Sequence, residues 1–289
     1  MDKPTISIIG TGKLGSTLAL ALAQKGYTIN GLWDSDSAKL QETARAVTPI
    51  RSDQDPVAAA KGSEIVILAV PDDSIRPVSD QLASRQALSK GQIICHCSGF
   101  LPSAVLVANK MLGASIASLH PLASFSRDLS PWTRYSGCYF GLEGDAAAMG
   151  RLRLMVESLD CHPVDVPASR KSLYHVSSVM ASNYLAILLY AAERMMGSAL
   201  DDEAKTADML GSLARTVMEN IGQDGPAGSL SGPIERGDLQ TVSGHLESLK
   251  KDFPQGIEPY KVLGRLMLTV ARQRHPERAE WDAMSRLLD

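Results

Sequence analysis

The stretch Ile6-Ser-Ile-Ile-Gly-Thr-Gly-Lys-Leu-Gly15 decides the fold of this 289-residue chain. A short β-branched run, Ile6–Ile9, ends at Gly10 and predicts a buried strand. An amphipathic stretch, Leu14–Ala23, follows at once and predicts a helix, with Gly26 placed to end it. Glycines at the spacing Gly-x-Gly-x-x-Gly between a strand and a helix are typical of a turn that binds a dinucleotide. The alternative is a tight strand-to-helix turn without a ligand.

Each glycine of this turn has a physical task in the dinucleotide interpretation. Gly10 allows the tight turn, Gly12 lets the backbone approach a pyrophosphate, and Gly15 lets the helix pack closely on the strand. The amide groups and the dipole at the start of the helix favour the phosphate charge. The predicted cofactor-binding residues of the turn are Gly10, Thr11, Gly12, Lys13, Leu14 and Gly15.

An acidic residue, Asp34, stands at the end of the second predicted strand, which begins at Tyr27. An acidic side chain about 20 residues beyond the glycine turn bonds the ribose hydroxyls of NAD and repels a 2′-phosphate, so NAD is favoured over NADP. Asp34 could instead cap the next helix. Ser35, Ser37 and Lys39 follow and could hold a phosphate if Asp34 turns away.

Further strands and helices alternate through the first half of the chain. The apolar run Glu64–Val70 is typical of a strand buried on both faces. Strand-helix alternation at this spacing predicts a mostly parallel sheet of the Rossmann type. Ligands bind at the carboxyl ends of such strands, so further cofactor contacts are expected at Ala69, Val70, Pro71 and Ser98.

The pattern changes near residue 165, and only helices are predicted beyond it. The sequence therefore predicts an α/β, dinucleotide-binding domain over 1–165 and an all-α domain over 166–289. The first helical stretch, Ser169–Leu200, is apolar on nearly all sides, which is typical of a helix in a core or a subunit interface.

Composition excludes several classes of protein. Lys plus Arg total 29 and Asp plus Glu total 32, so a broad nucleic-acid-binding surface is not expected. The sequence shows no signal peptide and no uncharged apolar stretch long enough for a membrane span, and its four cysteines form no disulfide or zinc pattern. We expect a cytoplasmic protein with no metal. Cys95-His96-Cys97 is not a metal site in this interpretation, because alternate residues of a strand point to opposite faces.

Other segments accompany the glycine turn: Leu68-Ala-Val-Pro-Asp72, His96-Cys-Ser-Gly99 and Leu119-His-Pro-Leu122. Together they resemble the N-terminal half of the 6-phosphogluconate dehydrogenase-like oxidoreductases, which include hydroxyisobutyrate dehydrogenases and ketopantoate, pyrroline-5-carboxylate and imine reductases. A less characterised branch, the Rossmann-like proteins with a DUF2520 domain, is similar also in His120-Pro121, Tyr174-His175, Ala181-Ser-Asn183 and Gly232-Pro-x-x-Arg-Gly-Asp238.

The resemblance implies hydride transfer from NAD(P)H, a substrate bound between the domains and a homodimer built through the helices. Related dehydrogenases carry a Lys on the first interdomain helix with polar residues three and four positions later, where this chain has Lys171, Tyr174 and His175. Residues at this spacing share one face of a helix. Because His175 replaces the Asn of the hydroxyacid dehydrogenases, their mechanism is not carried over whole.

Reduction of a carbonyl or imine needs a proton donor near the forming charge. His175 suits that task, since its ordinary pKa lies near neutrality. Lys171 could polarise the carbonyl or donate the proton, Tyr174 could bond the same oxygen, and His120 could contact substrate or nicotinamide. The alternatives are a solvated lysine and histidines held in the core or in a turn.

Two residues farther along complete the predicted catalytic set. Asn183 lies in an apolar helix and needs hydrogen-bond partners, so it is either a structural clamp or a substrate contact. Arg236 could bind a substrate carboxylate with two parallel hydrogen bonds, or pair with Asp238 to hold its loop.

These features predict an NAD(P)-dependent oxidoreductase that acts on a small, anionic carbonyl, imine or hydroxy compound. The sequence contains no nucleophile elbow of a serine hydrolase and no P-loop. Two alternatives stay open: a nicotinamide-dinucleotide-binding sensor or scaffold without turnover, and a reductase that uses another electron carrier.

Overall fold

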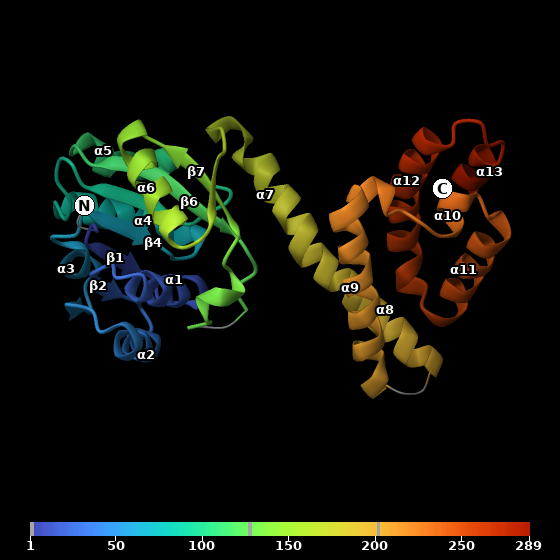
Figure 1. Cartoon of the computed structure of the whole chain (residues 1–289), viewed down its shortest axis with the longest axis horizontal. Helices are drawn as coiled ribbons and strands as arrows, with labels where there is room; N and C mark the ends of the chain where they lie inside the picture. Colours follow the sequence, from blue (N-terminus) through green and yellow to red (C-terminus); the bar gives the residue numbers. More distant parts are fainter. Residues whose placement is uncertain (1–2, 127–128, 201–202) are drawn as a thin grey trace. The chain divides into compact units, whose positions relative to one another are not determined.

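The structure is a computed structural model that describes residues 3–126, 129–200 and 203–289. The chain forms two compact units, one extending to Ser182 and the other spanning Asn183–Asp289. The first unit is an α/β domain and the second is built of helices, as Figure 1 shows. The predicted fold class is therefore confirmed.

The first unit contains the strands β1 (Ile6–Ile9), β2 (Ile29–Trp33), β3 (Arg51–Ser52), β4 (Ile65–Leu68), β5 (Ile93–His96), β6 (Ser115–Leu122), β7 (Tyr139–Gly144) and β8 (His162–Asp165). They form one eight-stranded sheet in the order β3-β2-β1-β4-β5-β6-β7-β8. Neighbouring strands are parallel except for β6 and β7, which are antiparallel. The reversal of strand order between β1 and β4 is the place where ligands bind in open sheets of this kind.

Helices flank this sheet: α1 (Lys13–Gln24), α2 (Ser37–Val47), α3 (Pro56–Ala60), α4 (Asp72–Ser84), α5 (Val107–Met111), α6 (Ala146–Ser158) and α7 (Lys171–Val179). The central strand β4 shows why both faces are covered. Its side chains are fully buried, with Ile65 and Ile67 in one hydrophobic core and Val66 and Leu68 in the other. Alternate side chains point to opposite faces, so a strand with helices on both sides is apolar at every position.

The second unit contains α8 (Leu185–Leu200), α9 (Glu203–Gly228), α10 (Pro233–Arg236), α11 (Leu239–Asp252), α12 (Ile257–Arg274) and α13 (Trp281–Leu288). Its core joins the last four of these helices through Ile234, Val242, Leu268, Ala271, Trp281, Met284 and Leu288. By contrast, α8 has no buried residue in this chain. The sequence pattern allowed the apolar stretch 169–200 to be buried in a core, but no residue of α8 is buried by the described part of the chain.

The compact units divide at Ser182 and Asn183, whereas the sequence pattern placed a boundary at residue 165. The difference has a physical cause, because α7 is attached to the sheet by its side chains. Lys171 bonds Ser118 on β6, and Tyr174 bonds His120 on the same strand. The division falls instead within the π-helical turn Met180–Tyr184, which follows α7.

The helical segment Ala168–Leu200 is long and apolar enough to cross a membrane, judged by length and composition alone. It is the one segment of this kind in the described part of the chain. Helices that meet other protein surfaces satisfy the same criteria, so this finding is weak evidence for a membrane span.

Substitution of Gly15 by Ala is expected to destabilise the first unit. A Cβ at this position would lie 1.9 Å from the carbonyl oxygen of Gly10, which is backbone and cannot move aside cheaply. Overpacking of this kind costs about 1–3 kcal/mol. Thermal unfolding followed by circular dichroism measures the effect. The matched control is Gly150→Ala in α6, where a Cβ meets nothing within 4 Å; equal melting temperatures of the two variants would contradict the expectation.

Candidate active site

The glycine turn joins β1 to α1 at the switch of strand order. Gly10 has a positive φ of 102°, and a Cβ there would lie 2.6 Å from the carbonyl oxygen of Ala69. Gly15 lies against the Gly10 carbonyl, as described above. Gly12 differs from both, because a Cβ at this position would meet nothing within 4 Å. The turn is therefore packed tightly on the side of the sheet and open at Gly12.

A cavity of about 460 Å³ lies along the open side of this turn. Its walls come from the turn, from the end of β2 and from the segment between β4 and α4. Many predicted cofactor-binding residues line it, namely Gly10, Gly12, Asp34, Ser35, Ala69, Val70 and Pro71, together with Trp33, Asp36, Lys39, Asp73, Ser74, Pro77 and Val78. The other residues predicted from the turn, Thr11, Lys13, Leu14 and Gly15, lie beside this wall without lining the cavity.

Asp34 is bonded to the glycine turn. Its Oδ2 accepts hydrogen bonds from the Thr11 backbone amide at 2.5 Å and from the Thr11 hydroxyl at 3.0 Å. Its Oδ1 accepts from the Asp36 amide at 2.8 Å. The cap of α2 is Asp36 and not Asp34, since Asp36 accepts from the amides of Ala38 and Lys39. The carboxylate of Asp34 thus fixes the turn as well as lining the cavity.

The residues present fit a dinucleotide. The Gly12 position leaves open space where a side chain would otherwise project, and Gly12 is also the N-cap of the 12-residue helix α1. A glycine N-cap has no side chain to occupy the first amides of the helix, so these amides are available to a phosphate group.

A second group of side chains lies at the carboxyl ends of β5 and β6. The Lys171 ammonium group donates to the Ser118 hydroxyl at 2.7 Å and to the Ser98 carbonyl at 3.1 Å. Lys171 is only 1% exposed. Ser98 in turn donates from Oγ to Asp72 at 2.8 Å, at the start of α4. These contacts tie α7, β6 and the loop after β5 together.

Three aromatic side chains meet next to this lysine. His120 Nδ1 lies 3.0 Å from the Tyr174 hydroxyl, and the ring centroids of His120 and His175 are 6.0 Å apart. Both histidine rings pack over Gly99, where a Cβ would lie 2.8 Å from each of them. The structure therefore brings Lys171, Tyr174 and His175 to one face of α7, and adds His120 and Ser98 from the strand ends.

Burial shifts the pKa values of His120, Tyr174 and Lys171. It lowers the pKa of His120 to about 4, with help from the nearby Lys171 charge. It raises the pKa of Tyr174, although a hydrogen bond from the Gly141 backbone opposes this shift. Burial also lowers the pKa of Lys171, and the carboxylates of Glu143 and Asp72 oppose that shift. At neutral pH, His120 and Tyr174 are therefore both uncharged.

Two contributors escaped the sequence analysis: Ser118 and Glu143. Ser118 stands two positions before His120 on one strand, so their shared face was a usable signal. Glu143, on β7, accepts from the amide and hydroxyl of Ser103 at 2.6 Å each. No local sequence pattern reveals that contact, because the two residues lie 40 positions apart in the chain.

Asn183 and Arg236 belong to the second unit, and both are exposed. Asn183 lies within the π-helical turn Met180–Tyr184, so the α-helical spacing that unites Lys171 with His175 does not continue to it. Arg236 ends α10, and its charge contributes to the lowered pKa of Asp238. Their roles toward a substrate stay predictions.

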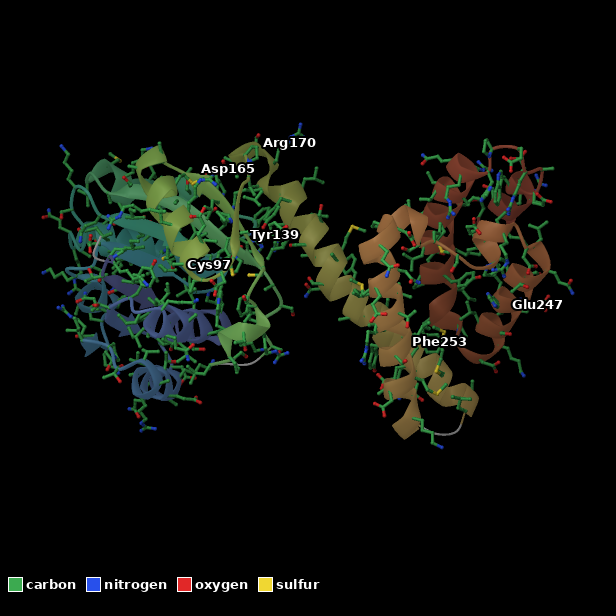
Figure 2. All side chains as sticks on the ribbon, viewed as in Figure 1. Cys97, Tyr139, Asp165, Arg170, Glu247 and Phe253 are labelled. Atoms are coloured by element: carbon green, nitrogen blue, oxygen red, sulfur yellow. The ribbon has the colours of Figure 1, made fainter. Side chains whose placement is uncertain are left out.

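The Cys95-His96-Cys97 segment is packed inside the first unit, where Figure 2 labels Cys97. Both ring nitrogens of His96 have partners: Nδ1 accepts from the Ser98 amide at 3.2 Å, and Nε2 lies 3.3 Å from the Pro102 carbonyl. Within the described ranges, no group of three or more His, Cys, Asp or Glu side chains has the arrangement of a metal site.

Two family models match successive segments of the chain. Residues 2–121 match the family described as Rossmann-like domain, and residues 138–267 match the domain of unknown function DUF2520. The predicted recognition is thus confirmed, and the DUF2520 segment includes β7 and the site helix α7.

Among curated relatives, a glycerol-3-phosphate dehydrogenase [NAD(P)+] from Anaeromyxobacter dehalogenans is 32% identical over 105 residues, which is 32% of this chain. The match spans 31% of the length of that relative. A solved structure from Thermotoga maritima is 26% identical, with a TM-score of 0.71 over 93% of this chain and 99% of that one. Pyrroline carboxylate reductase from Plasmodium falciparum, solved with NADP bound, shares the fold at 11% identity, with a TM-score of 0.59 and full coverage of both chains (100% each).

Stability is expected to fall as the pH falls from about 6.5 toward 4. Burial lowers the pKa of His96 from 6.5 to about 4. Between these values the unfolded chain binds more protons than the folded one, so the free energy of unfolding decreases on acidification, by up to about 1.4 kcal/mol per pH unit for one histidine. Urea unfolding between pH 4.5 and 7.5 measures the slope.

His96→Asn removes one of the two histidines with a pKa of about 4 and should reduce that slope by about half, since His120 still contributes. His162→Asn, at an exposed position of β8, should leave the slope as in the parent protein. An unchanged slope in His96→Asn would show that burial of this ring is not responsible for the pH dependence.

Proposed function

We propose that this protein is an NAD(P)-dependent oxidoreductase that transfers a hydride to or from a small, anionic carbonyl, imine or hydroxy compound. One observation carries the proposal. The glycine turn with its open Gly12 position and the hydrogen-bonded pair His120–Tyr174 both lie toward the carboxyl ends of strands of one mostly parallel sheet. A cofactor cradle and a proton-donating group at the same edge are the two parts that such a reaction needs.

The comparisons support the same class. The curated relative named above is a dehydrogenase that uses NAD(P)+, and the Plasmodium reductase was solved with NADP bound. NAD and NADP are accordingly the proposed cofactors, with Asp34 favouring the ribose of NAD, and with Ser35 and Lys39 lining the same cavity for a 2′-phosphate.

The bound nicotinamide would supply or accept the hydride. The amides at the start of α1 would hold the pyrophosphate, since they carry the positive end of the helix dipole. The Tyr174 hydroxyl donates the proton to the substrate oxygen or nitrogen, because burial keeps it protonated at neutral pH. A neutral His120 bonds the phenol oxygen through Nδ1 and orients it. His175, whose ring faces that of His120, is the second candidate for the substrate contact.

Cofactor titration and turnover test this function together. Binding of NADH and NADPH is measured by calorimetry on the full chain, and hydride transfer by nicotinamide absorbance with a panel of small oxoacids, cyclic imines and hydroxyacids. Tyr174→Phe should bind cofactor normally and lose about 10²–10⁴-fold in kcat, the usual contribution of general acid-base catalysis.

Gly12→Val is the complementary variant, since its side chain fills the open space of the turn and should abolish cofactor binding. Absence of binding to both dinucleotides would refute the proposal. Tight binding without turnover for any member of the panel would favour the sensor or scaffold interpretation.

We further propose that the protein is a cytoplasmic homodimer joined through the helical unit. Large apolar side chains are exposed along α8 and α9, and α8 has no buried residue in this chain. Soluble proteins rarely leave a surface of this size and kind uncovered. The exposed residues include Leu185 (38%), Ile187 (57%), Leu188 (40%), Tyr190 (57%), Met209 (47%), Leu213 (58%), Val217 (43%) and Met218 (52%).

Analytical ultracentrifugation is expected to show a dimer whose dissociation is promoted by Ile187→Lys combined with Leu213→Lys. Burying two charges in an apolar interface without partners is costly, so dimer affinity should fall steeply. Leu154→Lys, at a 64% exposed position of α6, is the control and should leave the dimer intact. A monomer at micromolar concentration in the parent protein would contradict the proposed assembly.

A further inference from the structure

Two side-chain hydrogen bonds connect β6 to α7. Ser118 and His120 stand two positions apart on the strand, and Lys171 and Tyr174 stand three positions apart on the helix. Each spacing keeps its pair on one face of its element. The Ser118 hydroxyl bonds Lys171 Nζ at 2.7 Å, and His120 Nδ1 bonds the Tyr174 hydroxyl at 3.0 Å. The Ser118–Lys171 hydrogen bond therefore fixes the distance and the register between β6 and α7 at the neighbouring His120–Tyr174 pair.

The Lys171 ammonium group also controls the loop that supports the histidine rings. Its second hydrogen bond goes to the carbonyl of Ser98, at 3.1 Å. The next residue is Gly99, over which the rings of His120 and His175 pack. The Ser98 hydroxyl meanwhile accepts from the amide of Leu101 at 2.9 Å, which closes the turn. A displacement of the Ser98 carbonyl would thus shift the surface on which both rings rest.

A direct role of this lysine in substrate binding is hard to reconcile with its surroundings. Lys171 is among the largest fully buried side chains of the molecule, with 1% of its surface exposed. Two of its three ammonium hydrogens are directed to the protein atoms named above. The family resemblance implied a lysine that touches substrate, and in this chain the corresponding amine faces the ends of the strands.

We propose that Lys171 is a positioning residue, which joins the ends of β5 and β6 to α7 and thereby holds His120 and Tyr174 in contact for the reaction. The inference rests on the proposed function, because it assigns Lys171 a part in that same site. Tyr174 and His120 then act on the substrate, and Lys171 acts through them.

The charge of Lys171 contributes in a second way. Besides burial, it is the largest electrostatic cause of the lowered pKa of His120, ahead of His175 on the same helix and His96 on β5. Glu143 on β7, Asp72 on α4 and Cys97 after β5 favour the charged form of the lysine itself. A charged Lys171 therefore keeps His120 neutral, in hydrogen-bond contact with the Tyr174 phenol.

The decisive variant is Lys171→Met, which keeps the length of the side chain and removes its charge and its donors. Histidine ring NMR on the full-length protein, without substrate, follows the titration of His120. In the parent protein the midpoint is expected at about pH 4. In Lys171→Met it should rise by about one unit, and it should stay below the ordinary value because the ring is still buried.

Lys110→Met is the control, since Lys110 pairs at the surface with Asp145 and should leave the His120 titration unchanged. If Lys171→Met does not fold, Ser118→Ala tests the same link, because it removes one acceptor while keeping the lysine charge. Loss of that acceptor should lower the pKa of Lys171 further, as followed by NMR of its Nζ.

Activity measurements separate this inference from the proposed function. Lys171→Met should lower kcat with cofactor affinity unchanged, and the His120 midpoint should move with it. Loss of activity with an unmoved His120 midpoint would show that Lys171 acts on substrate directly and would overturn the inference, as would an Nζ titration in Ser118→Ala equal to that of the parent. A moved midpoint in a protein that turns over no substrate would refute the proposed function and leave the link between Lys171 and His120 intact.

Discussion

The close approach of β1, α1 and β4 at the glycine turn is the constraint on which the first unit depends. Gly10 lies against the Ala69 carbonyl and Gly15 against the Gly10 carbonyl, so neither position has room for a Cβ. Because of this contact, α1 packs closely against β1 and β4. The side chains of these two strands belong to both hydrophobic cores. The open position at Gly12 and the adjoining cavity are consequences of the same backbone path.

The carboxyl ends of β5 and β6 are organised by polar contacts instead. A buried ammonium group, a serine carbonyl and a serine hydroxyl hold α7 against β5 and β6. Such a network is stabilising only when each buried group has a partner, and it defines geometry more strictly than apolar packing does. The site helix therefore belongs structurally to the sheet, although the sequence pattern assigns it to the helical half of the chain.

The sequence predicts well what local patterns control. Apolar runs located strands such as β1, β2 and β4, and helical spacing grouped Lys171, Tyr174 and His175, which the structure brings together on α7. The two-residue strand β3 and the short helices α3 and α5 carry too few residues for a periodic signal. Local patterns also do not reveal contacts between residues far apart in the chain. Glu143 on β7 bonds Ser103, 40 positions earlier, and Asp34 bonds Thr11, 23 positions earlier.

The bond between Asp34 and Thr11 couples two properties that are usually treated as separate. The carboxylate that lines the cavity is also hydrogen-bonded to the glycine turn, through the Thr11 amide and hydroxyl. Replacing Asp34 to change the proposed coenzyme preference would therefore loosen the loop that we propose as the pyrophosphate site. Evolution or engineering toward the phosphorylated coenzyme has a less costly route at Ser35 and Lys39, which border the cavity without bracing that turn.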